Sequence, residues 1–535
     1  MTHRRTSALP FRMLHLILSL FVVTAGTGYS QVTGTILGTV VDETGASVPE
    51  AAVAATNTHT GETRRAVTDA TGNYIVTGLP VGQYRVEVKR DGFKSFIASG
   101  IGLEVNQNIR IDARLAVGAV VESVEVTTDA AKVDTYQTQL GTVVDTNRVN
   151  DLPLNGRNVY DLAITLPGVS NTNFNTVSNS GGAFLNVNGS RTRQSTFMLD
   201  GAFNNDLWRN SGNTSPNPDA VQEFRLITSN FNAEFGRSPG AIFNVVMKSG
   251  TNSLHGSVFE FLRNNKLNAR PFFQPTVPQL RQNQYGFALG GPVIRNKTFF
   301  FGSFQGLKVR SVAFVNNVTT PTAAERAGDF SAAPAAQRPI DPLTNAPFPG
   351  AQIPVSRFDP VAKTILEKYV PLPNTADNRL QSTGSSRDNE NQYLLKIDHM
   401  LTSNQKVYGS FFWINGGSYQ PFPSSTQVPN YANNTTEYRQ RNLVASHDWI
   451  ISPTVLNQAQ FTWSKRDTPI VDEFTHSWSD YGSKVTLGAT PPRPPQLFIN
   501  GRWQMGTFGG NGQLQQSFSA SNTLTATRGK HTLKA

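Results

Sequence analysis

The second half of the chain alternates apolar and polar residues over unusually long segments. Between 514 and 527, Leu514, Phe518 and Leu524 recur at even positions and polar residues fill the odd ones, and 454–465 alternates in the same way. Segments of this length exceed the ~5–6 residues of a typical globular strand and suit the ~9–11 residues of a strand that crosses a membrane. Period-two alternation gives one face of such a strand to lipid and the other to water.

The connections between candidate strands separate a barrel from a soluble sandwich. The candidate strands are 254–262, 282–292, 298–307, 391–399, 406–414, 438–450, 454–465, 514–527 and one that begins at His531. Long connections at 263–281, 308–390, 415–437 and 466–513 alternate with short ones at 293–297, 400–405, 451–453 and 528–530. Outer-membrane barrels join their strands by short periplasmic turns and longer extracellular loops. The sequence therefore predicts the first part of a transmembrane antiparallel β-barrel over 251–535, with its long loops outside the cell.

Three further expectations concern this region. Five of the six tryptophans fall within it, as aromatic girdles at the membrane interfaces require: Trp413, Trp449, Trp463, Trp478 and Trp503. The connection 308–390 is rich in proline and alanine and is expected to be an irregular loop. Because plugged outer-membrane transporters close with ~22 strands, we expect a truncated barrel and a fragment of a longer gene product.

The first residues have the pattern of a cleaved export signal. Three arginines precede the apolar run Met13–Ala25, which is shorter than the ~20 apolar residues of a membrane-spanning helix. Small residues at Gly28 and Ser30 place the cleavage before Gln31, so 1–30 is the predicted signal peptide. An exported chain without a transmembrane helix is secreted, periplasmic or a barrel.

Composition argues against several classes of function. The absence of cysteine excludes disulfides, thiolate zinc sites and a cysteine nucleophile. The net charge of +10 is spread along the chain without a basic run, so nucleic acid is not expected as a partner. His59 and Glu62 match the spacing of a zinc peptidase pair, but they lie in a predicted turn without a third ligand. We predict no enzymatic activity, no catalytic residue, no metal site and no cofactor.

Residues 34–116 contain short strand-like runs separated by turn residues, which indicates an all-β sandwich. Four blocks resemble the carboxypeptidase regulatory-like family: Gly38–Asp42, Thr68–Tyr74, Leu79–Tyr84 and Gly92-Phe93. The resemblance implies a transthyretin-like β-sandwich, also described as a carbohydrate-binding-like fold, over 31–117. Whether that module binds a glycan or a partner, or is a spacer, stays open.

Residues 129–250 are rich in asparagine, glycine and serine and fit a compact mixed α/β domain. Their blocks, Asp151–Leu162, Val187–Arg191, Phe197–Gly201, Val221–Ile227 and Gly236–Asn252, resemble the plug domain of TonB-dependent outer-membrane receptors, especially the Oar-like branch, in which a regulatory-like sandwich precedes the plug. The plug-motif residues are Asn188, Gly189, Arg191, Asp200, Gly201, Gly236, Gly240, Asn244 and Lys248. For Arg191, Asp200 and Gly201 we favour turn formation and pairing with the barrel wall over contact with substrate.

The resemblance also implies a mechanism and partners. In such receptors the plug fills the barrel, and a TonB-type energy-transducing protein pulls on a short segment called the TonB box. The linker 118–128 contains the candidate box, Val120, Val121, Glu122, Ser123, Val124, Glu125, Val126, Thr127 and Thr128, whose alternation suits strand addition. The alternative is that this segment forms the last strand of the sandwich.

The fold class expected is thus mostly β: a sandwich, a mixed α/β plug and the first part of a barrel. The expected location is the outer membrane, surrounded by its lipid, with the sandwich and the box in the periplasm. The expected function is binding and active import of a large or scarce nutrient. The alternative is a surface adhesin or a receptor for glycan or protein that transports nothing.

Overall fold

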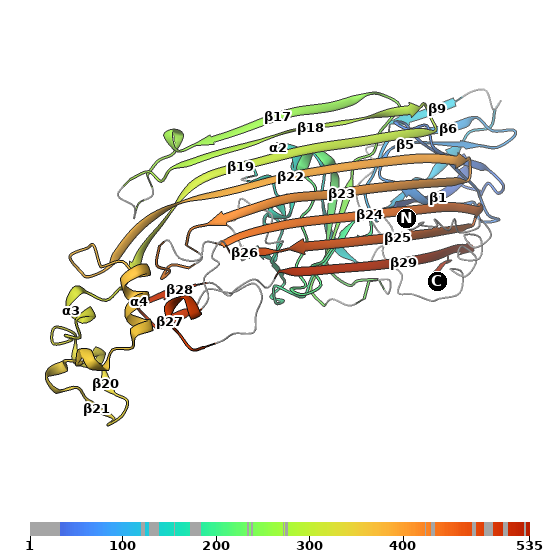
Figure 1. Ribbon diagram of the computed structural model, residues 1–535. Helices are drawn as coiled ribbons and strands as arrows, with labels where there is room; N and C mark the ends of the chain where they lie inside the picture. Colours follow the sequence, from blue (N-terminus) through green and yellow to red (C-terminus); the bar gives the residue numbers. More distant parts are fainter. Residues whose placement is uncertain are drawn as a thin grey trace, which may run out of the picture.

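The computed structural model describes residues 33–118, 123–127, 139–154, 156–171, 183–232, 235–236, 239–270, 272, 276–422, 424–429, 434–472, 478–485, 496–506, 512–528 and 531–535. The predicted signal peptide and its cleavage site, Ser30 and Gln31, lie outside these residues. The described part is mostly β, which confirms the predicted fold class. Figure 1 shows long strands side by side, with shorter strands at one end and loops with small helices at the other.

The first part of the chain is a sandwich of two sheets, with order β4-β1-β7 plus β8 beside β1, and order β3-β2-β5-β6-β9. Its strands are β1 (Thr33–Asp42), β2 (Ala52–Asn57), β3 (Thr63–Val67), β4 (Asn73–Pro80), β5 (Gly82–Lys89), β6 (Ser95–Leu103), β7 (Asn108–Arg110), β8 (Ala113–Leu115) and β9 (Ser123–Thr127). Alternate residues of these strands, such as Val53 and Val86, are fully buried and form one core between the sheets. This period-two burial is what the predicted sandwich requires.

The second part is built on a mixed sheet with the order β10-β15-β16-β13-β14. Its elements are β10 (Leu140–Val144), α2 (Thr146–Asp151), η1 (Val159–Thr165), β11 (Val169–Asn171), β12 (Leu185–Val187), β13 (Thr196–Leu199), β14 (Ala202–Phe203), η3 (Pro218–Ala220), β15 (Val221–Ser229) and β16 (Ile242–Met247). Phe197 and Phe243 stack with centroids 4.8 Å apart, and Tyr160 meets Phe197 edge-on at 5.1 Å. We call this part, residues 139–250, the plug.

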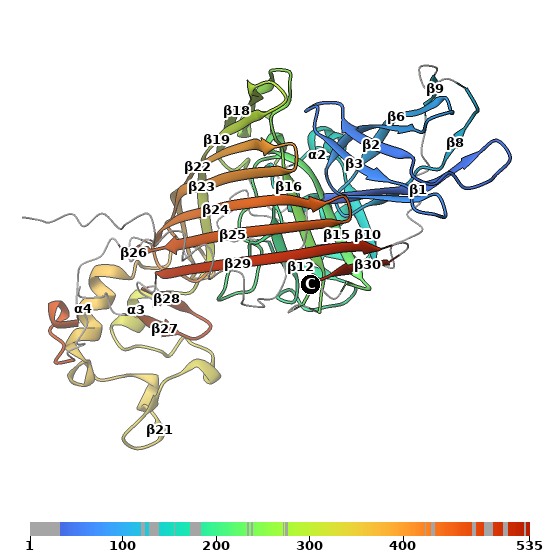
Figure 2. The ribbon, with the colours of Figure 1, turned by 90° about the vertical axis from the view of Figure 1, so that its right-hand side faces the viewer.

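The third part is one antiparallel sheet with the order β17-β18-β19-β22-β23-β24-β25-β29-β30, which we call the barrel sheet. Its strands are β17 (His255–Asn264), β18 (Leu280–Ile294), β19 (Thr298–Val318), β22 (Leu380–Thr402), β23 (Gln405–Gln420), β24 (Asn434–Ser452), β25 (Val455–Thr468), β29 (Gln513–Arg528) and β30 (His531–Lys534), and β26 (Ile470–Asp472) adds beside β24. Each predicted strand is present in sequence order. Figure 2 shows the sheet curving past the plug strands β15 and β16.

One face of the barrel sheet buries many polar residues, and the other face exposes many apolar ones. On one face Gln284, Gln305 and Gln392 are each only 1% exposed. On the other face Phe287 is 47% exposed and Phe518 67% exposed. The buried polar face meets the plug, and the exposed apolar face has the composition that lipid requires. We call the first face the inner face and the second the outer face.

Aromatic side chains form a continuous row on the outer face. Tyr285, Phe304, Tyr393 and Trp413 come from four successive strands, with ring centroids 6.1, 5.1 and 4.7 Å apart along the row. Such a row is one element of an aromatic girdle. The prediction that all five tryptophans serve a girdle is wrong for Trp478 and Trp503, because both pack in the core of the long loops.

The barrel sheet has two different ends. The short-turn end carries the tight connections such as Arg295–Lys297. The long-loop end carries the long connections, among them 319–379 and 469–512, and is where β19 and β22 extend beyond their predicted bounds. The expectation of an irregular loop over 308–390 is wrong in part, because this connection contains α3 (Ala323–Arg326), β20 (Ile340–Asp341), β21 (Ala346–Pro347) and α4 (Pro360–Tyr369). The later connection 469–512 contains η8 (Trp478–Tyr481), β27 (Leu497–Ile499) and β28 (Trp503–Met505). Asp359 caps α4 by accepting a hydrogen bond from Ala362 N at 2.9 Å.

Among the described residues, no helix combines the length and the apolar character needed to cross a bilayer.

Candidate functional site

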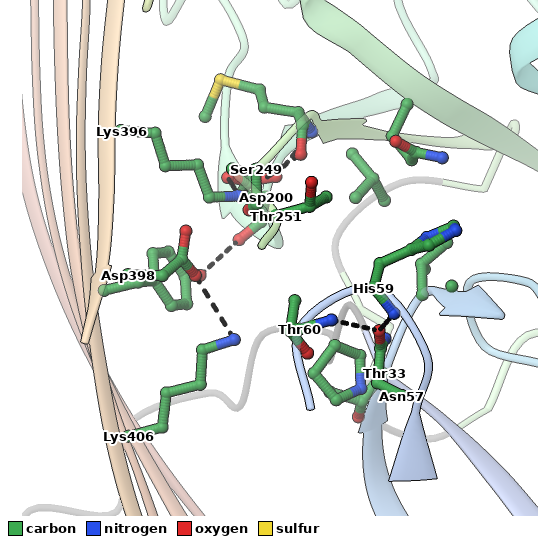
Figure 3. Close-up of a pocket in the computed structure, with 18 of the residues that line it drawn as sticks. Thr33, Asn57, His59, Thr60, Asp200, Ser249, Thr251, Lys396, Asp398 and Lys406 are labelled. Carbon is green, nitrogen blue, oxygen red and sulfur yellow. Dashed lines mark hydrogen bonds and ion pairs between the residues drawn. The ribbon is translucent and has the colours of Figure 1, made fainter. Parts of the chain in front are cut away.

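The sandwich, the plug and the barrel sheet meet around a polar cavity of about 140 Å³ at the short-turn end. Figure 3 shows Lys396, Asp398 and Lys406 entering it from the barrel strands, with His59 and Thr60 of the sandwich on the opposite side. The end of the plug supplies its third wall. Charged side chains from two parts of the chain thus face one cavity, which makes it the candidate functional site.

A tight turn brings Asp200 of the plug to this cavity. Asp200 and Gly201 join β13 to β14 with positive φ angles of 47° and 75°, the backbone of a two-residue type I′ hairpin. Aspartate and glycine are among the residues that favour this conformation, because an ordinary side chain is strained there. Asn188 and Gly189 have the same pattern, with φ angles of 50° and 74°, directly after β12.

Asp200 is bound to the barrel wall through a buried ion pair. Its Oδ2 accepts a hydrogen bond from Lys396 Nζ at 2.8 Å, and its Oδ1 accepts one from Met247 N at 2.8 Å. The two charged side chains are 1% and 8% exposed. The main-chain oxygen of Asp200 accepts hydrogen bonds from Tyr408 at 3.3 Å and from Gln460 at 3.0 Å. One turn of the plug therefore contacts three strands of the barrel sheet.

A second charged group joins the sandwich to the barrel. Lys406 Nζ lies 3.3 Å from Asp398 Oδ1 of the barrel and 3.7 Å from Glu62 Oε2 of the sandwich. Glu62 also pairs with Arg64 at 2.9 Å. The carboxylate of Glu62, from the His59–Glu62 pair noted in the sequence, therefore lies between the cationic side chains of Arg64 and Lys406.

The remaining plug-motif residues are spread over the plug rather than gathered at the cavity. Arg191 and Gly236 are exposed, and Asn244 is fully buried inside the plug sheet. Lys248 is partly buried, and burial lowers its pKa against the opposing effect of Asp219. Gly240 approaches the backbone closely, since a Cβ there would lie 2.6 Å from Gln194 O. Of the nine, only Asp200 reaches the charged cavity, whose other main residues were not predicted.

Two further plug–wall contacts were also missed. Arg157 pairs with Asp219, and its guanidinium lies 4.3 Å from the ring centre of Phe259 of the barrel. Asp206 pairs with Arg466 and accepts a hydrogen bond from Gln515 Nε2 at 2.9 Å. The plug is therefore held by polar contacts along the whole inner face. The only available signal was the placement of Arg466 and Gln515 at inward positions of the strand alternation.

For Asp206, opposing effects act on the carboxyl. Burial raises its pKa, but hydrogen bonds from Arg209 N and Gln515, together with the charge of Arg466, outweigh burial and lower the pKa overall. Asp206 is therefore charged at neutral pH and available to pair with the wall.

The sandwich is attached to the plug by a separate buried contact. Glu223 Oε1 on β15 accepts a hydrogen bond from Val105 N at 2.5 Å, and Arg225 Nη1 donates to the oxygens of Val105 and Asn106, both at 2.8 Å. Burial, aided by the nearby Glu104 and Asp145 charges, raises the pKa of Glu223 to about 8. The carboxyl group of Glu223 and the guanidinium group of Arg225 thus both bind the main chain of one sandwich loop.

Part of the candidate TonB box is a strand of the sandwich. Ser123–Thr127 form β9, which pairs in parallel with Ser95–Ser99 of β6 at the edge of the five-stranded sheet. This is the arrangement of the alternative interpretation, in which the segment ends the sandwich. Val120, Val121, Glu122 and Thr128 lie outside the described residues.

The cavity is lined by groups that can form hydrogen bonds and ion pairs. Ammonium and carboxylate groups are paired with one another, and within the described ranges no three His, Cys, Asp or Glu residues are grouped to hold a metal ion. This arrangement joins three parts of one chain.

An apolar outer face, a polar inner face and a plug bound to that inner face together define an outer-membrane β-barrel protein with a plug. Residues 246–535 match the family model of the outer membrane beta barrel domain, and the chain belongs to that family. Residues 35–116 match the carboxypeptidase regulatory-like domain. The outer membrane is therefore its location.

The chain is similar to one curated relative and to two solved structures. It is 30% identical over 310 residues to the TonB-dependent transporter Oar of Myxococcus xanthus, an alignment that covers 53% of this chain and 28% of the relative. It is similar in fold to the outer-membrane transporter YddB of Escherichia coli, with TM-score 0.46, 11% identity and coverage of 72% and 45% of the two chains. For the ferric enterobactin receptor PfeA of Pseudomonas aeruginosa the values are 0.40, 13%, 73% and 47%.

These findings confirm the predicted resemblance to TonB-dependent receptors of the Oar-like branch. The chain spans less than a third of the length of the curated relative.

Proposed function

We propose that this chain is part of a TonB-dependent receptor that binds a large or scarce nutrient at the cell surface and imports it, without chemistry on the nutrient. The observation that carries the proposal is the polar contact between plug and inner face. Asp200, Asp206 and Asp219 all bind barrel residues by hydrogen bonds or ion pairs. Such contacts exchange with water at small net cost. Beside them, the core of the plug packs against apolar inner-face residues that include Phe301, Phe412 and Ile414.

Under this proposal the short-turn end lies in the periplasm and the long-loop end outside the cell, as in other outer-membrane barrels. The similarity to a TonB-dependent transporter supports an energy-transducing partner on the periplasmic side. β9 can bind that partner by strand addition, because it is an edge strand and, among the described strands, pairs only with β6. A strand of the partner can add to its other edge.

Deleting Val120–Thr128 in the full-length gene product tests the proposal. The ligand is first found by growth of a deletion strain on single carbon and iron sources. We expect the deletion to abolish energy-dependent accumulation of that nutrient while surface binding stays nearly intact. Val124→Pro, which removes a ladder hydrogen bond, should weaken accumulation less, with Ser95→Ala as a control inside the same sheet. Unchanged accumulation after the deletion refutes the box, and surface binding without any accumulation in the wild type favours the adhesin.

A further inference from the structure

A row of charged side chains of alternating sign connects the plug turn to the sandwich through the barrel sheet. All neighbours in the row except one pair are joined by an ion pair. The exception is Lys396 and Asp398, which lie two residues apart on the inner face of β22, so that ~7 Å of strand separates them. No side chain of the row is more than 15% exposed. From plug to sandwich, the row contains Asp200, Lys396, Asp398, Lys406, Glu62 and Arg64.

Asp398 lies in the middle of the row and has one carboxylate oxygen to spare. Its Oδ1 lies 3.3 Å from Lys406 Nζ. Its Oδ2 is buried and has no hydrogen-bond partner among the described residues. Lys396 and Asp398 line the same cavity, and Figure 3 shows both side chains projecting into it from the barrel strand. Because a buried acceptor without a donor is costly, Asp398 Oδ2 is available to a second cation, and Lys396 is the cation beside it on β22.

This arrangement makes the plug turn and the sandwich compete for the charges of the barrel. In the structure Asp200 binds Lys396 at 2.8 Å, which leaves Asp398 to Lys406. Lys406 in turn divides its charge between Asp398 at 3.3 Å and Glu62 at 3.7 Å. If Asp200 moves away, Lys396 is drawn to Asp398, because opposite charges attract strongly where little water screens them. Asp398 then balances less of the charge of Lys406, which binds Glu62 more strongly.

One further carboxylate lines the same cavity. Asp448 belongs to β24, and its Oδ1 accepts a hydrogen bond from Gln458 Nε2 at 3.1 Å. Both residues are part of the barrel sheet, so a change in this carboxylate does not by itself reach the sandwich. The described ion pair that joins Lys406 to the sandwich is the one with Glu62.

We propose that the row couples the plug turn to the sandwich with negative sign: loss of the Asp200–Lys396 pair strengthens the Glu62–Lys406 pair, and loss of Glu62–Lys406 strengthens Asp200–Lys396. The sandwich is then held most firmly to the barrel when the plug turn is displaced. This gives the sandwich a regulatory role, because its attachment responds to the position of the plug. The coupling rests on the contacts alone, and only its use during import rests on the proposed function.

Hydrogen exchange of one main-chain amide reports the attachment of the sandwich to the barrel. Asn252 N, just before β17, donates a hydrogen bond to His59 O of the sandwich at 2.9 Å. Exchange of this amide therefore requires that the sandwich and the barrel separate locally. The exchange rate is measured on the full-length product in detergent or in outer membranes, without an energy source.

The first measurement starts from the plug. We expect Asp200→Asn to slow exchange of the Asn252 amide ~3-fold, a coupling of the size found between members of one charge network. Adding Lys396→Met removes the cation that competes for Asp398, so the double variant should show no slowing. If Asp200→Asn leaves the exchange of Asn252 unchanged, or if the slowing persists with Lys396→Met, the proposal is wrong.

The second measurement starts from the sandwich and does not depend on the folding of a plug variant. Coupling between two contacts is reciprocal, so Glu62→Gln, which leaves Lys406 to Asp398 and Lys396 to Asp200, should slow exchange of the β16 amides by the same ~3-fold. The matched control is Arg90→Gln, which removes an ion pair with Glu50 on the sandwich surface.

The control variant should change neither the Asn252 rate nor the β16 rates. Slowing seen from one side only, or the same slowing in Arg90→Gln, refutes the coupling. Neither measurement involves import. A full-length product that shows the coupling but accumulates no nutrient therefore contradicts the proposed function and supports the coupling.

Discussion

Replacing Asp200 by asparagine removes the negative charge of the plug turn but keeps the backbone conformation of the turn. Asparagine is tolerated at the positive φ of 47° and can still accept the hydrogen bond from Met247 N. What is lost is the carboxylate opposite Lys396, whose side chain is only 8% exposed. The change therefore leaves a buried ammonium with the Met247 oxygen, at 3.3 Å, as its remaining acceptor.

The size of the effect follows from this geometry. Removing one member of a buried ion pair costs ~3–5 kcal/mol, and the retained hydrogen bonds place Asp200→Asn near the lower value, ~3 kcal/mol. Lys396→Met removes the ammonium group that has lost its carboxylate partner. It also places an apolar side chain beside Tyr408, whose ring centre lies 5.2 Å from Lys396 Nζ. The double variant should then be destabilised by only ~1 kcal/mol relative to the parent, because replacing both partners avoids an unpaired buried group.

Hydrogen exchange of the β16 main-chain amides, Ile242–Met247, measures the local free energy of opening. We expect Asp200→Asn to speed their exchange ~100-fold, since 1.4 kcal/mol corresponds to a factor of ten. The amides of β2, Ala52–Asn57, are the internal control and should not change. If the acceleration of exchange in the double variant equals the product of the accelerations in the two single variants, the two side chains do not act as a pair and the reasoning is refuted.

Three further predictions test separate features of the structure. Gly240→Ala should destabilise the plug by ~1–3 kcal/mol in denaturant titrations, because its Cβ meets backbone atoms, whereas Gly236→Ala, with open space around its Cβ, should change stability by less than ~0.5 kcal/mol. The pKa of Glu223 is raised from 4.5 to about 8, so this side chain binds more protons in the folded state than in the unfolded state. Its contribution to stability is therefore present below pH ~4.5 and is lost as pH rises to ~8. Glu223→Gln should remove that part of the pH dependence of unfolding, and an unaltered profile contradicts the assignment. Phe518→Arg on the outer face should destabilise the full-length barrel by ~2–4 kcal/mol in detergent or lipid. Ser517 points inward, so Ser517→Arg should act through the plug contacts instead. Equal effects at both positions would count against the assignment of the two faces.

The strands of the barrel sheet were predictable because their signal is local and repeated. Alternation over β29 and β25 fixes both the strand and its lipid-facing side, and the alternating connection lengths order the strands. The Asp200–Gly201 turn could also be predicted from the sequence, because few residue pairs suit two successive positive φ angles. These features need no knowledge of distant contacts.

The contacts that join the three parts were not predictable in the same way. Lys396 and Asp200 are 196 residues apart, and Arg466 and Asp206 are 260 apart. Sequence alternation places Lys396 on the inner face but does not tell which plug residue it meets. The fate of Ser123–Thr127 was likewise a choice between a free segment and an edge strand, because alternating valines suit either arrangement.

The core shared by the long loops has a consequence for recognition of the cell surface. The end of β19 and three different connections contribute to a single hydrophobic cluster, which contains Val318, Ile365, Val428, Tyr481 and Trp503. The surface above this cluster is therefore a discontinuous epitope, assembled from segments more than 180 residues apart in the chain. Binding of an antibody or a phage to this surface depends on the fold of all the loops that contribute to it. Sequence variation in one loop alters the antigenic shape presented by the others.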